Sequence, residues 1–447
     1  MSKLKFWGAV GEVTGSCYEL TEGGVRVMID YGMFQGLDSV EKNQKAVEGV
    51  SGLTAMVLTH AHLDHCGRLP LLVAGGFKGR IYATKPTVDL VYIVLLDSAK
   101  IAKGNSRDGR VALYMEDEVE EVMKFFEVVD YEKWKGIEGW GSFRFLDAGH
   151  ILGSASVEVK LSSGKGLVFS GDLGNDPSPI VKGVEDPTEA EVIIMESTYG
   201  DRDHPPRGEE KIVIERLCKE IETNQGTLLI PAFSIERTQE LLMLFDELKR
   251  EKRVSEKLLI YMDGPMGEKV TAIYERYPEY FNKALQEHTH WDDPFNFPGL
   301  KVIEKSSLSK KVSEVREAKV IIAGSGMMSG GRIMGHAKKL LPDSKTVVLF
   351  TGFQAKGTLG REVKDGQKRV LIEGSEVVVK ARVEAIDSMS AHADQGQLLS
   401  WLKSINGVGR VILTHGEDEA REVLEGKVKE ILGVAVEKPL WGEELSV

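Results

Sequence analysis

The feature that most constrains the fold of this chain is a run of metal-ligand side chains directly after a short apolar segment. Residues 55–58 are apolar and of strand length, and the next seven residues read Thr-His-Ala-His-Leu-Asp-His, with ligand-type side chains at His60, His62, Asp64 and His65. In an extended segment His60 and His62 project to the same side, and a turn into a following helix would bring Asp64 and His65 towards a neighbouring point. One short segment can therefore supply ligands to two adjacent metal ions.

Two metal ions need more ligands than this segment supplies, and the chain offers three at the ends of other strand-like segments. His150 follows Asp-Ala-Gly, Asp172 follows Phe-Ser-Gly, and His415 follows Leu-Thr. Imidazole and carboxylate ligands without cysteine favour zinc, with manganese or iron as alternatives that the sequence leaves open. The predicted ligands are His60, His62 and His150 for one metal, Asp64, His65 and His415 for the other, and Asp172 as a bridge.

Length, charge and cysteine usage narrow the class of protein. A chain of 447 residues exceeds what one hydrophobic core usually holds, so two domains are expected. No segment reaches the roughly 20 apolar residues of a membrane-spanning helix, and no signal peptide is recognisable, which predicts a cytoplasmic protein without membrane contact. Three dispersed cysteines favour reduced, buried thiols. A net charge of −12 argues against coating of nucleic acid through a broad basic face.

The pattern of expected strands and helices changes twice along the chain. Residues 1–199 are rich in short apolar runs of strand length. From residue 211 strands and helices alternate strictly, as in strand 227–231 and helix 236–252, which is typical of a parallel sheet. After residue 375, short apolar runs that end in histidine-bearing loops resemble those of residues 1–199. We therefore predict a domain at 200–375, inserted between residues 1–199 and 376–447 of a first domain.

The order of the ligands resembles the metallo-β-lactamase superfamily. His-x-His-x-Asp-His at residues 60–65 is followed by the isolated His150 and then by Gly-Asp at Asp172. The resemblance implies an αββα sandwich with the metal site at one edge of its sheets. Asp30, in Met-Ile-Asp-Tyr-Gly, matches the first acidic position of the superfamily, where the carboxylate supports the metal-bound water and the ligands.

Three further positions resemble the signature residues of the β-CASP nucleases within that superfamily. Glu196 stands in Met-Glu-Ser-Thr-Tyr-Gly, His392 in Ser-Met-Ser-Ala-His-Ala-Asp, and His415 in Leu-Thr-His-Gly. The family carries a Rossmann-like α/β insertion, the β-CASP domain, between the positions that match Glu196 and His392. The resemblance covers essentially the whole chain, and histidine at position 415 is similar to the RNA-directed branch, which includes RNase J and the pre-mRNA cleavage endonuclease.

The resemblance implies hydrolysis of RNA phosphodiester bonds, and the chemistry of the residues agrees with it. A water activated by two zinc ions would attack phosphorus. His392 would protonate the departing 3′ oxygen, and Glu196 would orient His392 and raise its pKa. The products would carry 5′-phosphate and 3′-hydroxyl ends, whether cleavage is endonucleolytic, 5′-exonucleolytic or both. The predicted catalytic residues are His392, Glu196, Asp30 and Asp172.

A glycine-rich turn at residues 324–332 lies between a predicted strand and helix, where backbone amides can bind phosphate. The turn resembles the Ser-Gly-Met loop of the family, and residues 231–237 and 352–361 resemble stretches that face its RNA channel. Salt-bridged surface arginines are the alternative for the basic residues. The candidate RNA contacts are Ser325, Gly326, Met327, Arg332, Arg237, Arg361, Ser388 and Ser390.

Two other functions were weighed against a ribonuclease. A non-catalytic RNA-binding relative would have lost ligands that this chain retains, and a metallohydrolase of small esters would leave the inserted domain and His392 without a role. Single-stranded RNA is the expected partner, and the sequence leaves open whether the chain forms a homodimer. No KH module or extra C-terminal domain is recognisable, so we expect a stand-alone enzyme. Four histidines match no ligand set and are expected in loops or at the surface: His204, His288, His290 and His336.

Overall fold

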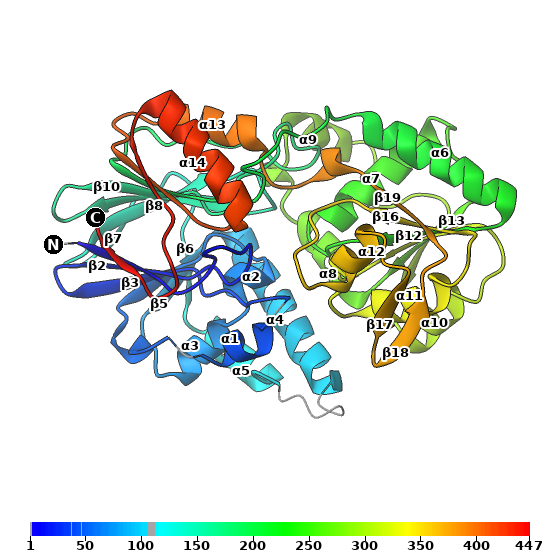
Figure 1. The fold of residues 1–447 in the computed structure, drawn as a ribbon, viewed down its shortest axis with the longest axis horizontal. Coiled ribbons are helices and arrows are strands. Elements are labelled where there is room, and N and C mark those ends of the chain that lie inside the picture. The colour runs from blue at the N-terminus through cyan, green and yellow to red at the C-terminus, as the bar shows by residue number, and fades with distance from the viewer. Residues whose placement is uncertain (1, 37, 46, 106–111) are drawn as a thin grey trace. The chain divides into compact units, whose positions relative to one another are not determined.

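Residues 2–36, 38–45, 47–105 and 112–447 are described by the structure, a computed structural model (Figure 1). The chain divides into two compact units. Unit 1 comprises Met1–Asp203 and His392–Val447, and unit 2, inserted between these two parts, comprises His204–Ala391. Each unit has its own sheets and its own hydrophobic core.

Two sheets pack face to face in unit 1. Within the described residues each has seven strands, in the orders β22-β1-β2-β3-β4-β5-β6 and β21-β20-β11-β10-β9-β8-β7. The first sheet contains β1 (Lys3–Phe6), β2 (Tyr18–Glu22), β3 (Val25–Ile29), β4 (Ala55–Val57), β5 (Arg80–Ala83), β6 (Phe126–Val128) and β22 (Glu444–Ser446). The second contains β7 (Lys135–Ile137), β8 (Gly141–Asp147), β9 (Ala155–Leu161), β10 (Gly166–Phe169), β11 (Val192–Met195), β20 (Arg410–Leu413) and β21 (Ala435–Glu437).

Alternating apolar residues of both sheets form the central core of unit 1. Trp140, Phe143, Phe145 and Phe169 are at most 1% exposed between the sheets. Burial of such aromatic side chains stabilises a core by roughly 1.5–3 kcal/mol each. The sheets are therefore held rigidly enough to fix the loops at their edges.

Helices cover the outer faces of the two sheets. On the second sheet, α13 (Gln395–Ser404) and α14 (Asp418–Leu432) bury Trp401 and Leu424 in a separate core. Figure 1 shows the remaining helices of unit 1 on the side of the first sheet. This arrangement confirms the expected αββα sandwich. These remaining helices are α1 (Ser39–Gln44), η1 (Val50–Gly52), α2 (Leu63–Cys66), α3 (Leu69–Ala74), α4 (Lys85–Asn105) and α5 (Glu116–Met123).

Unit 2 is built on a parallel sheet with the order β14-β13-β15-β12-β16-β19. Its central strands are buried throughout, as expected for a sheet with helices on both faces. The Rossmann-like α/β domain is thus confirmed. Its strands are β12 (Thr227–Pro231), β13 (Leu259–Asp263), β14 (Leu300–Ile303), β15 (Lys319–Ala323), β16 (Thr346–Phe350) and β19 (Arg382–Ala385), with a hairpin of β17 (Arg369–Ile372) and β18 (Ser375–Val378). Its helices are α6 (Glu209–Asn224), α7 (Arg237–Arg250), α8 (Pro265–Tyr274), η3 (Pro278–Tyr280), α9 (Lys283–Thr289), α10 (Ser306–Val312), α11 (Arg332–Leu340), α12 (Leu359–Lys364) and η4 (Asp387–Met389).

The chain returns to unit 1 later than the sequence suggests. Residues 376–447 were assigned to the first domain, but β19 pairs in parallel with β16 in the sheet of unit 2. The reason is physical, because a short strand ending in polar residues fits the edge of either sheet, and only the pairing decides. No helix among the described residues is long and apolar enough to cross a membrane.

Candidate metal centre

Parallel strands bring the predicted site residues of unit 1 to one sheet edge. In the second sheet β10, β11 and β20 are parallel neighbours, so their carboxyl ends lie at the same edge. Asp172 follows β10, Glu196 follows β11 directly, and His415 follows β20. The loop after β8 adds His150, and the segment after β4 in the facing sheet adds the cluster that begins at His60.

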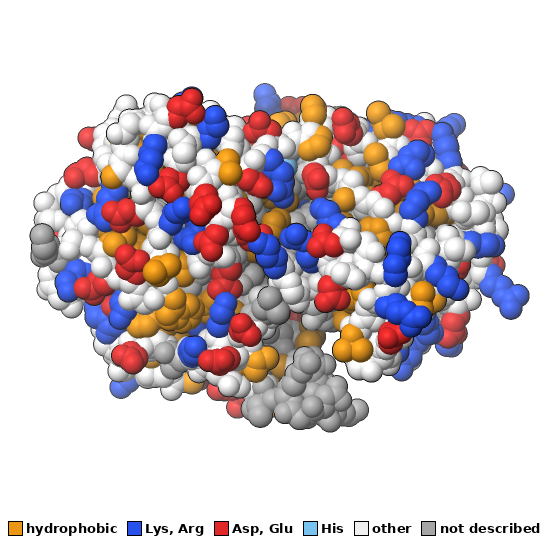
Figure 2. Space-filling model, viewed as in Figure 1, with side chains coloured by type: hydrophobic (Ala, Val, Ile, Leu, Met, Phe, Trp, Pro, Cys, Tyr) orange, Lys and Arg blue, Asp and Glu red, His pale blue; other side chains and the backbone are white. Residues whose placement is uncertain are grey.

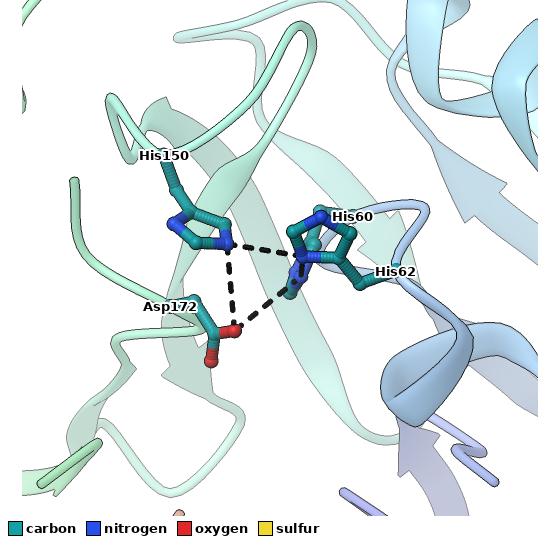
Figure 3. A group of neighbouring side chains, drawn as sticks. All are labelled: His60, His62, His150 and Asp172. Atoms are coloured by element: carbon teal, nitrogen blue, oxygen red, sulfur yellow. Dashed lines mark hydrogen bonds and ion pairs between the residues drawn. The ribbon is translucent and has the colours of Figure 1, made fainter. Parts of the chain in front are cut away.

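A first group of donor atoms contains three imidazoles and one carboxylate (Figure 3). His62 Nδ1 lies 3.2 Å from His60 Nε2 and 3.1 Å from His150 Nε2. Asp172 Oδ2 lies 3.5 Å from His60 Nε2 and 3.6 Å from His150 Nε2. The four atoms therefore surround a common point.

These spacings fit a tetrahedral zinc ion. Zinc bonds of about 2.0–2.2 Å place neighbouring tetrahedral donors roughly 3.3–3.6 Å apart, and the distances between donor atoms in the first group are 3.1–3.6 Å. Ring nitrogens at such distances cannot all be joined by hydrogen bonds, since each neutral imidazole has one N–H. A cation at the common point would satisfy all four atoms.

A second group contains Asp64, His65 and His415. His415 Nε2 lies 3.4 Å from His65 Nε2 and 3.6 Å from Asp64 Oδ2. Asp172 Oδ1 lies 3.3 Å from His65 Nε2 and is buried without a hydrogen-bond partner. The two oxygens of Asp172 thus face one group each, which is the geometry of a bridging carboxylate.

Burial and neighbouring charges shift the pKa values of several side chains in this cluster. Burial, together with the neighbouring His65, lowers the pKa of His60 well below its ordinary value, and burial lowers the pKa of His62 to about 4. Burial works in the opposite direction on Asp172, but His415 and His65 hold the pKa of that carboxyl well below its usual range. At neutral pH the first group therefore offers the unprotonated imidazoles of His60 and His62 beside a carboxylate. In the second group burial works against protonation of His65, but the carboxylates of Asp172 and Asp30 outweigh burial and raise the pKa of His65 well above its ordinary value.

Asp30 supports the second group through His65. Its Oδ2 lies 2.7 Å from His65 Nδ1, and its Oδ1 accepts a 2.8 Å hydrogen bond from the backbone N–H of Thr59. Two hydroxyls that were not predicted from the sequence contact other rings of the two groups. Thr59 Oγ1 lies 3.1 Å from His60 Nδ1, and Thr198 Oγ1 lies 3.1 Å from His415 Nδ1. Their only sequence signal is their place directly beside recognised motifs.

His392 and Glu196 form a pair beside the cluster. His392 Nδ1 lies 3.2 Å from Glu196 Oε1, and the His392 and His150 ring centroids are 4.6 Å apart. Backbone N–H groups of Leu173 and Thr198 donate to the Glu196 carboxylate and fix its orientation. Burial lowers the pKa of His392, but the carboxylates of Glu196 and Asp172 outweigh it and raise the pKa to about 9.

The candidate RNA contacts lie in unit 2, and two of the arginines among them already donate hydrogen bonds to other groups of the protein. Arg332 donates to Asp263 Oδ1 at 2.5 Å and to the backbone carbonyls of Ile303 and Glu304. Arg237 is 5% exposed and pairs with Glu240. These two guanidiniums have internal acceptors, as in the salt-bridged alternative that the sequence left open, and their contact with phosphate stays a prediction.

The remaining candidates differ in their accessibility. Arg361 keeps 34% of its side chain exposed beside Asp365. Ser325 Oγ accepts from the backbone N–H of Ser329 within the glycine-rich loop, and Gly326 lies against the Phe233 ring, where a Cβ would approach to 2.7 Å. Four of these candidates are buried: Gly326, Met327, Ser388 and Ser390.

Two histidines that matched no ligand pattern have defined surroundings. His336 was expected at the surface but is 2% exposed, with Nε2 2.6 Å from Asp263 Oδ2. His288 lies in a group with Asp246 and Asp292. The Arg250 guanidinium lies 3.3 Å from His288 Nε2 and 3.8 Å from Asp246 Oδ2, so an internal cation already occupies that group.

Three family models match consecutive parts of the chain. Residues 10–203 match the metallo-beta-lactamase superfamily, residues 238–363 the Beta-Casp domain, and residues 376–439 the Zn-dependent metallo-hydrolase RNA specificity domain.

Curated relatives match along almost the whole chain. Ribonuclease TTHA0252 of Thermus thermophilus is 38% identical over 99% of both chains, and an RNase J-like protein of Methanocaldococcus jannaschii is 33% identical over 93% of both. Transcription termination factor FttA of Pyrococcus horikoshii is 33% identical over 95% of this chain and 67% of its own. A solved Enterococcus faecalis protein of unknown function shares the fold, with a TM-score of 0.52 at 11% identity over 100% of both chains.

Proposed function

Because this chain belongs to the β-CASP family of the metallo-β-lactamase superfamily, we propose that it is a two-zinc ribonuclease that leaves 5′-phosphate and 3′-hydroxyl ends. One observation carries the proposal. The two oxygens of Asp172 face two separate groups of ligand atoms, and the His392–Glu196 pair lies directly beside them. The ribonuclease relative that matches from end to end supports RNA as the substrate.

Two groups of ligand-type side chains support two zinc ions. His60, His62 and His150 would hold one ion and Asp64, His65 and His415 the other, with Asp172 between them. When bound, the two ions supply Lewis acidity for the attacking water and for the phosphoryl oxygens. Asp30 contributes by holding His65 through Nδ1, which leaves Nε2 to face the centre.

His392 would deliver a proton to the departing 3′ oxygen. Glu196 engages its Nδ1, so the proton to be transferred is carried by Nε2. The raised pKa of His392, about 9, keeps the ring protonated at neutral pH, as a general acid requires. General acid catalysis of this kind contributes on the order of 10²- to 10⁴-fold.

Unit 2 would hold the RNA beyond the scissile bond. The loop that carries Ser325, Gly326 and Met327 joins β15 to α11, and Arg361 on α12 keeps an exposed guanidinium. Backbone amides in such a turn can bind phosphate without a large basic patch. Single-stranded RNA fits the proposal best because its phosphates can approach individual loops.

A direct test uses zinc-loaded protein and RNA labelled at its 5′ end, with either a monophosphate or a triphosphate there. We expect cleavage by the wild type, an at least 100-fold lower rate for His392→Ala, and no change for His290→Ala, which removes an exposed histidine of unit 2. Internal fragments indicate endonucleolytic cleavage, and mononucleotides from monophosphate ends alone indicate a 5′ exonuclease.

Two other outcomes would replace the proposal. RNA that binds but stays intact, with no zinc in elemental analysis, would indicate an RNA-binding protein without catalysis. Turnover of small esters that exceeds cleavage of RNA would indicate a different hydrolase.

A further inference from the structure

We propose that Thr59 and Thr198 are positioning residues that fix the ring tautomers of His60 and His415, so that Nε2 of each ring faces the metal. The inference rests on the proposed metal occupancy and deepens it, because it names the residues that set the affinity of each site. Both threonines are buried, at 1% and 3% exposure. Thr198 contacts His415 of the second group, and Thr59 contacts His60 of the first group and also lies 3.3 Å from His65 Nδ1 of the second.

The contacts of Thr198 and Asp172 favour one arrangement of protons around His415. The Thr198 hydroxyl donates to the backbone carbonyl of His415 at 3.2 Å, and a carbonyl can only accept. With its hydrogen on the carbonyl, the same oxygen accepts from His415 Nδ1 at 3.1 Å, and the Asp172 Oδ1 carboxylate oxygen, 3.6 Å from Nδ1, also favours a proton on that nitrogen. Nδ1 therefore carries the ring proton, and Nε2 presents its lone pair to His65 and Asp64.

Thr59 controls His60 by the same logic. Its hydroxyl donates to Asp30 Oδ2 at 2.8 Å, because a carboxylate oxygen can only accept. The lone pairs of Thr59 Oγ1 then accept from His60 Nδ1 at 3.1 Å. His60 Nε2 is left without a proton, and it faces His62 Nδ1 and Asp172 Oδ2.

The fold places the two hydroxyls at comparable points. Thr59 follows β4 in the first sheet, and Thr198 follows β11 in the second. The Thr59 side chain also packs against Gly171, where an added Cβ would lie 3.1 Å from Thr59 Cβ. Gly171 directly precedes Asp172, so the same threonine contacts the backbone beside the bridging carboxylate.

Loss of either threonine hydroxyl should lower the affinity of the site for zinc. A ligand imidazole with the wrong tautomer points a proton at the metal and must rearrange before it binds. Loss of such a supporting partner typically costs about 10- to 100-fold in metal affinity. Valine in place of threonine removes the hydroxyl with little change of volume, and serine keeps the hydroxyl.

The experiment measures zinc affinity by competition with a chelating dye for the wild type, Thr198→Val, Thr198→Ser and Thr414→Val. Thr414 is the matched control, since it is buried beside His415 but its hydroxyl contacts the backbone carbonyl of Met195 instead of a ring. In parallel, ¹⁵N NMR of histidine-labelled protein reports the tautomer of His415. Circular dichroism confirms that each variant is folded.

We expect Thr198→Val to bind one of two zinc ions about 10- to 100-fold more weakly and to lose the single Nδ1–H tautomer at His415. Thr198→Ser and Thr414→Val should stay within about 3-fold of the wild type, because both keep a hydroxyl on Nδ1. The corresponding change for the other zinc is expected in Thr59→Val.

Equal zinc affinity in Thr198→Val and wild type would overturn the inference while leaving the proposed function intact. Equal losses in Thr198→Val, Thr198→Ser and Thr414→Val would also overturn it, because the hydroxyl on the ring would then not be the cause. A wild type that binds no zinc would overturn the proposed function together with the inference.

Discussion

The protonation of His392 depends on one carboxylate. Burial alone would lower its pKa, and Glu196 at 3.2 Å outweighs burial and, with Asp172, raises the pKa to about 9. Asp172 is also the carboxylate that faces both ligand groups, so Glu196 is the partner that remains when metal ions neutralise Asp172. If His392 donates a proton as proposed, the pH range over which it can do so is set mainly by Glu196.

Glu196→Gln should lower kcat and shift its pH dependence. A general acid acts in its protonated form, so activity is retained below its pKa and lost as the pH rises through that pKa. In the wild type we expect the loss at a pH above the ordinary pKa of histidine, and in Glu196→Gln at a lower pH, because the stabilising negative charge is gone. The measurement is kcat against pH from 6 to 10, with Glu189→Gln, an exposed carboxylate of unit 1, as the control. An alkaline limb that is identical in both enzymes would contradict the role of Glu196.

At the scale of elements, the pattern of apolar residues predicts the helices and strands that form through local interactions. The alternation from residue 211 onwards correctly predicts β12, α7, β13 and their order, because each apolar run must be buried on the same sheet. The metal ligands converge as predicted, since the strands that precede them end at one sheet edge. Residue type and spacing are enough for both.

Long-range pairing explains what the sequence could not predict. The partner of β19 is chosen by hydrogen bonds to β16, more than thirty residues away in the chain. Arg332 was assigned to RNA because its loop resembles a phosphate-binding turn, but Asp263, at the end of a different strand, accepts its hydrogen bonds. The hydroxyls of Thr59 and Thr198 carry no pattern that separates them from other threonines.

Substitution of Arg332 should affect the stability of unit 2 more than the binding of RNA. Its guanidinium joins α11 to β13 and to the carbonyls that follow β14, and the Asp263 side chain is fully buried. Arg332→Gln should therefore lower the free energy of unfolding of unit 2 by about 1–3 kcal/mol, because Oδ1 of the buried Asp263 carboxylate loses its donor while His336 and Ser309 still contact Oδ2. Urea denaturation followed by hydrogen exchange measures this, with Lys338→Gln, an exposed residue of the same helix, as the control. If Arg332→Gln leaves the stability of unit 2 unchanged but raises the KM for RNA, Arg332 is an RNA contact instead.

Charge is distributed unevenly over the whole molecule. Of the 57 Lys and Arg and the 69 Asp and Glu, unit 2 has 30 and 28, which leaves 27 and 41 for unit 1. The net charge of −12 therefore comes from unit 1. On the visible face both signs are interspersed (Figure 2), and no broad basic surface is seen there. The net charge and this face together favour attraction of RNA through local contacts.

Few contacts predict a modest dependence of RNA affinity on salt. Each phosphate contact to a single strand contributes a slope of about −0.7 to the plot of log affinity against log salt, so three to five contacts give roughly −2 to −4. Removing a true contact, as proposed for Arg361→Gln, should make the slope shallower by about 0.7. Arg369→Gln is the matched control, because Arg369 is an exposed arginine of the β17–β18 hairpin. The binding assay uses the His392→Ala protein, which holds RNA uncut, and an equal slope for Arg361→Gln would exclude that contact.

Removal of metal should affect the two units differently. The ligand groups lie entirely in unit 1, where burial leaves Asp172 Oδ1 without a hydrogen-bond partner. Zinc at 100 times its dissociation constant stabilises a folded unit by about 2.7 kcal/mol per site, so a chelator should abolish activity and lower the unfolding temperature of unit 1. Calorimetry with and without chelator, followed by zinc addition, measures the loss and its reversal. Equal shifts in unit 2, or none in unit 1, would contradict this assignment.

The insertion of unit 2 into unit 1 also sets the order in which the site is synthesised. His60, His62, Asp64, His65, His150 and Asp172 all precede the insertion, whereas His392 is the first residue after it and His415 follows. A nascent chain therefore carries most of its metal ligands for the whole time that His204–Ala391 is being translated, without the proton donor and without the last ligand. If His392 and His415 are required as proposed, such a chain would not cut RNA, and the protein would be complete before an active nuclease forms.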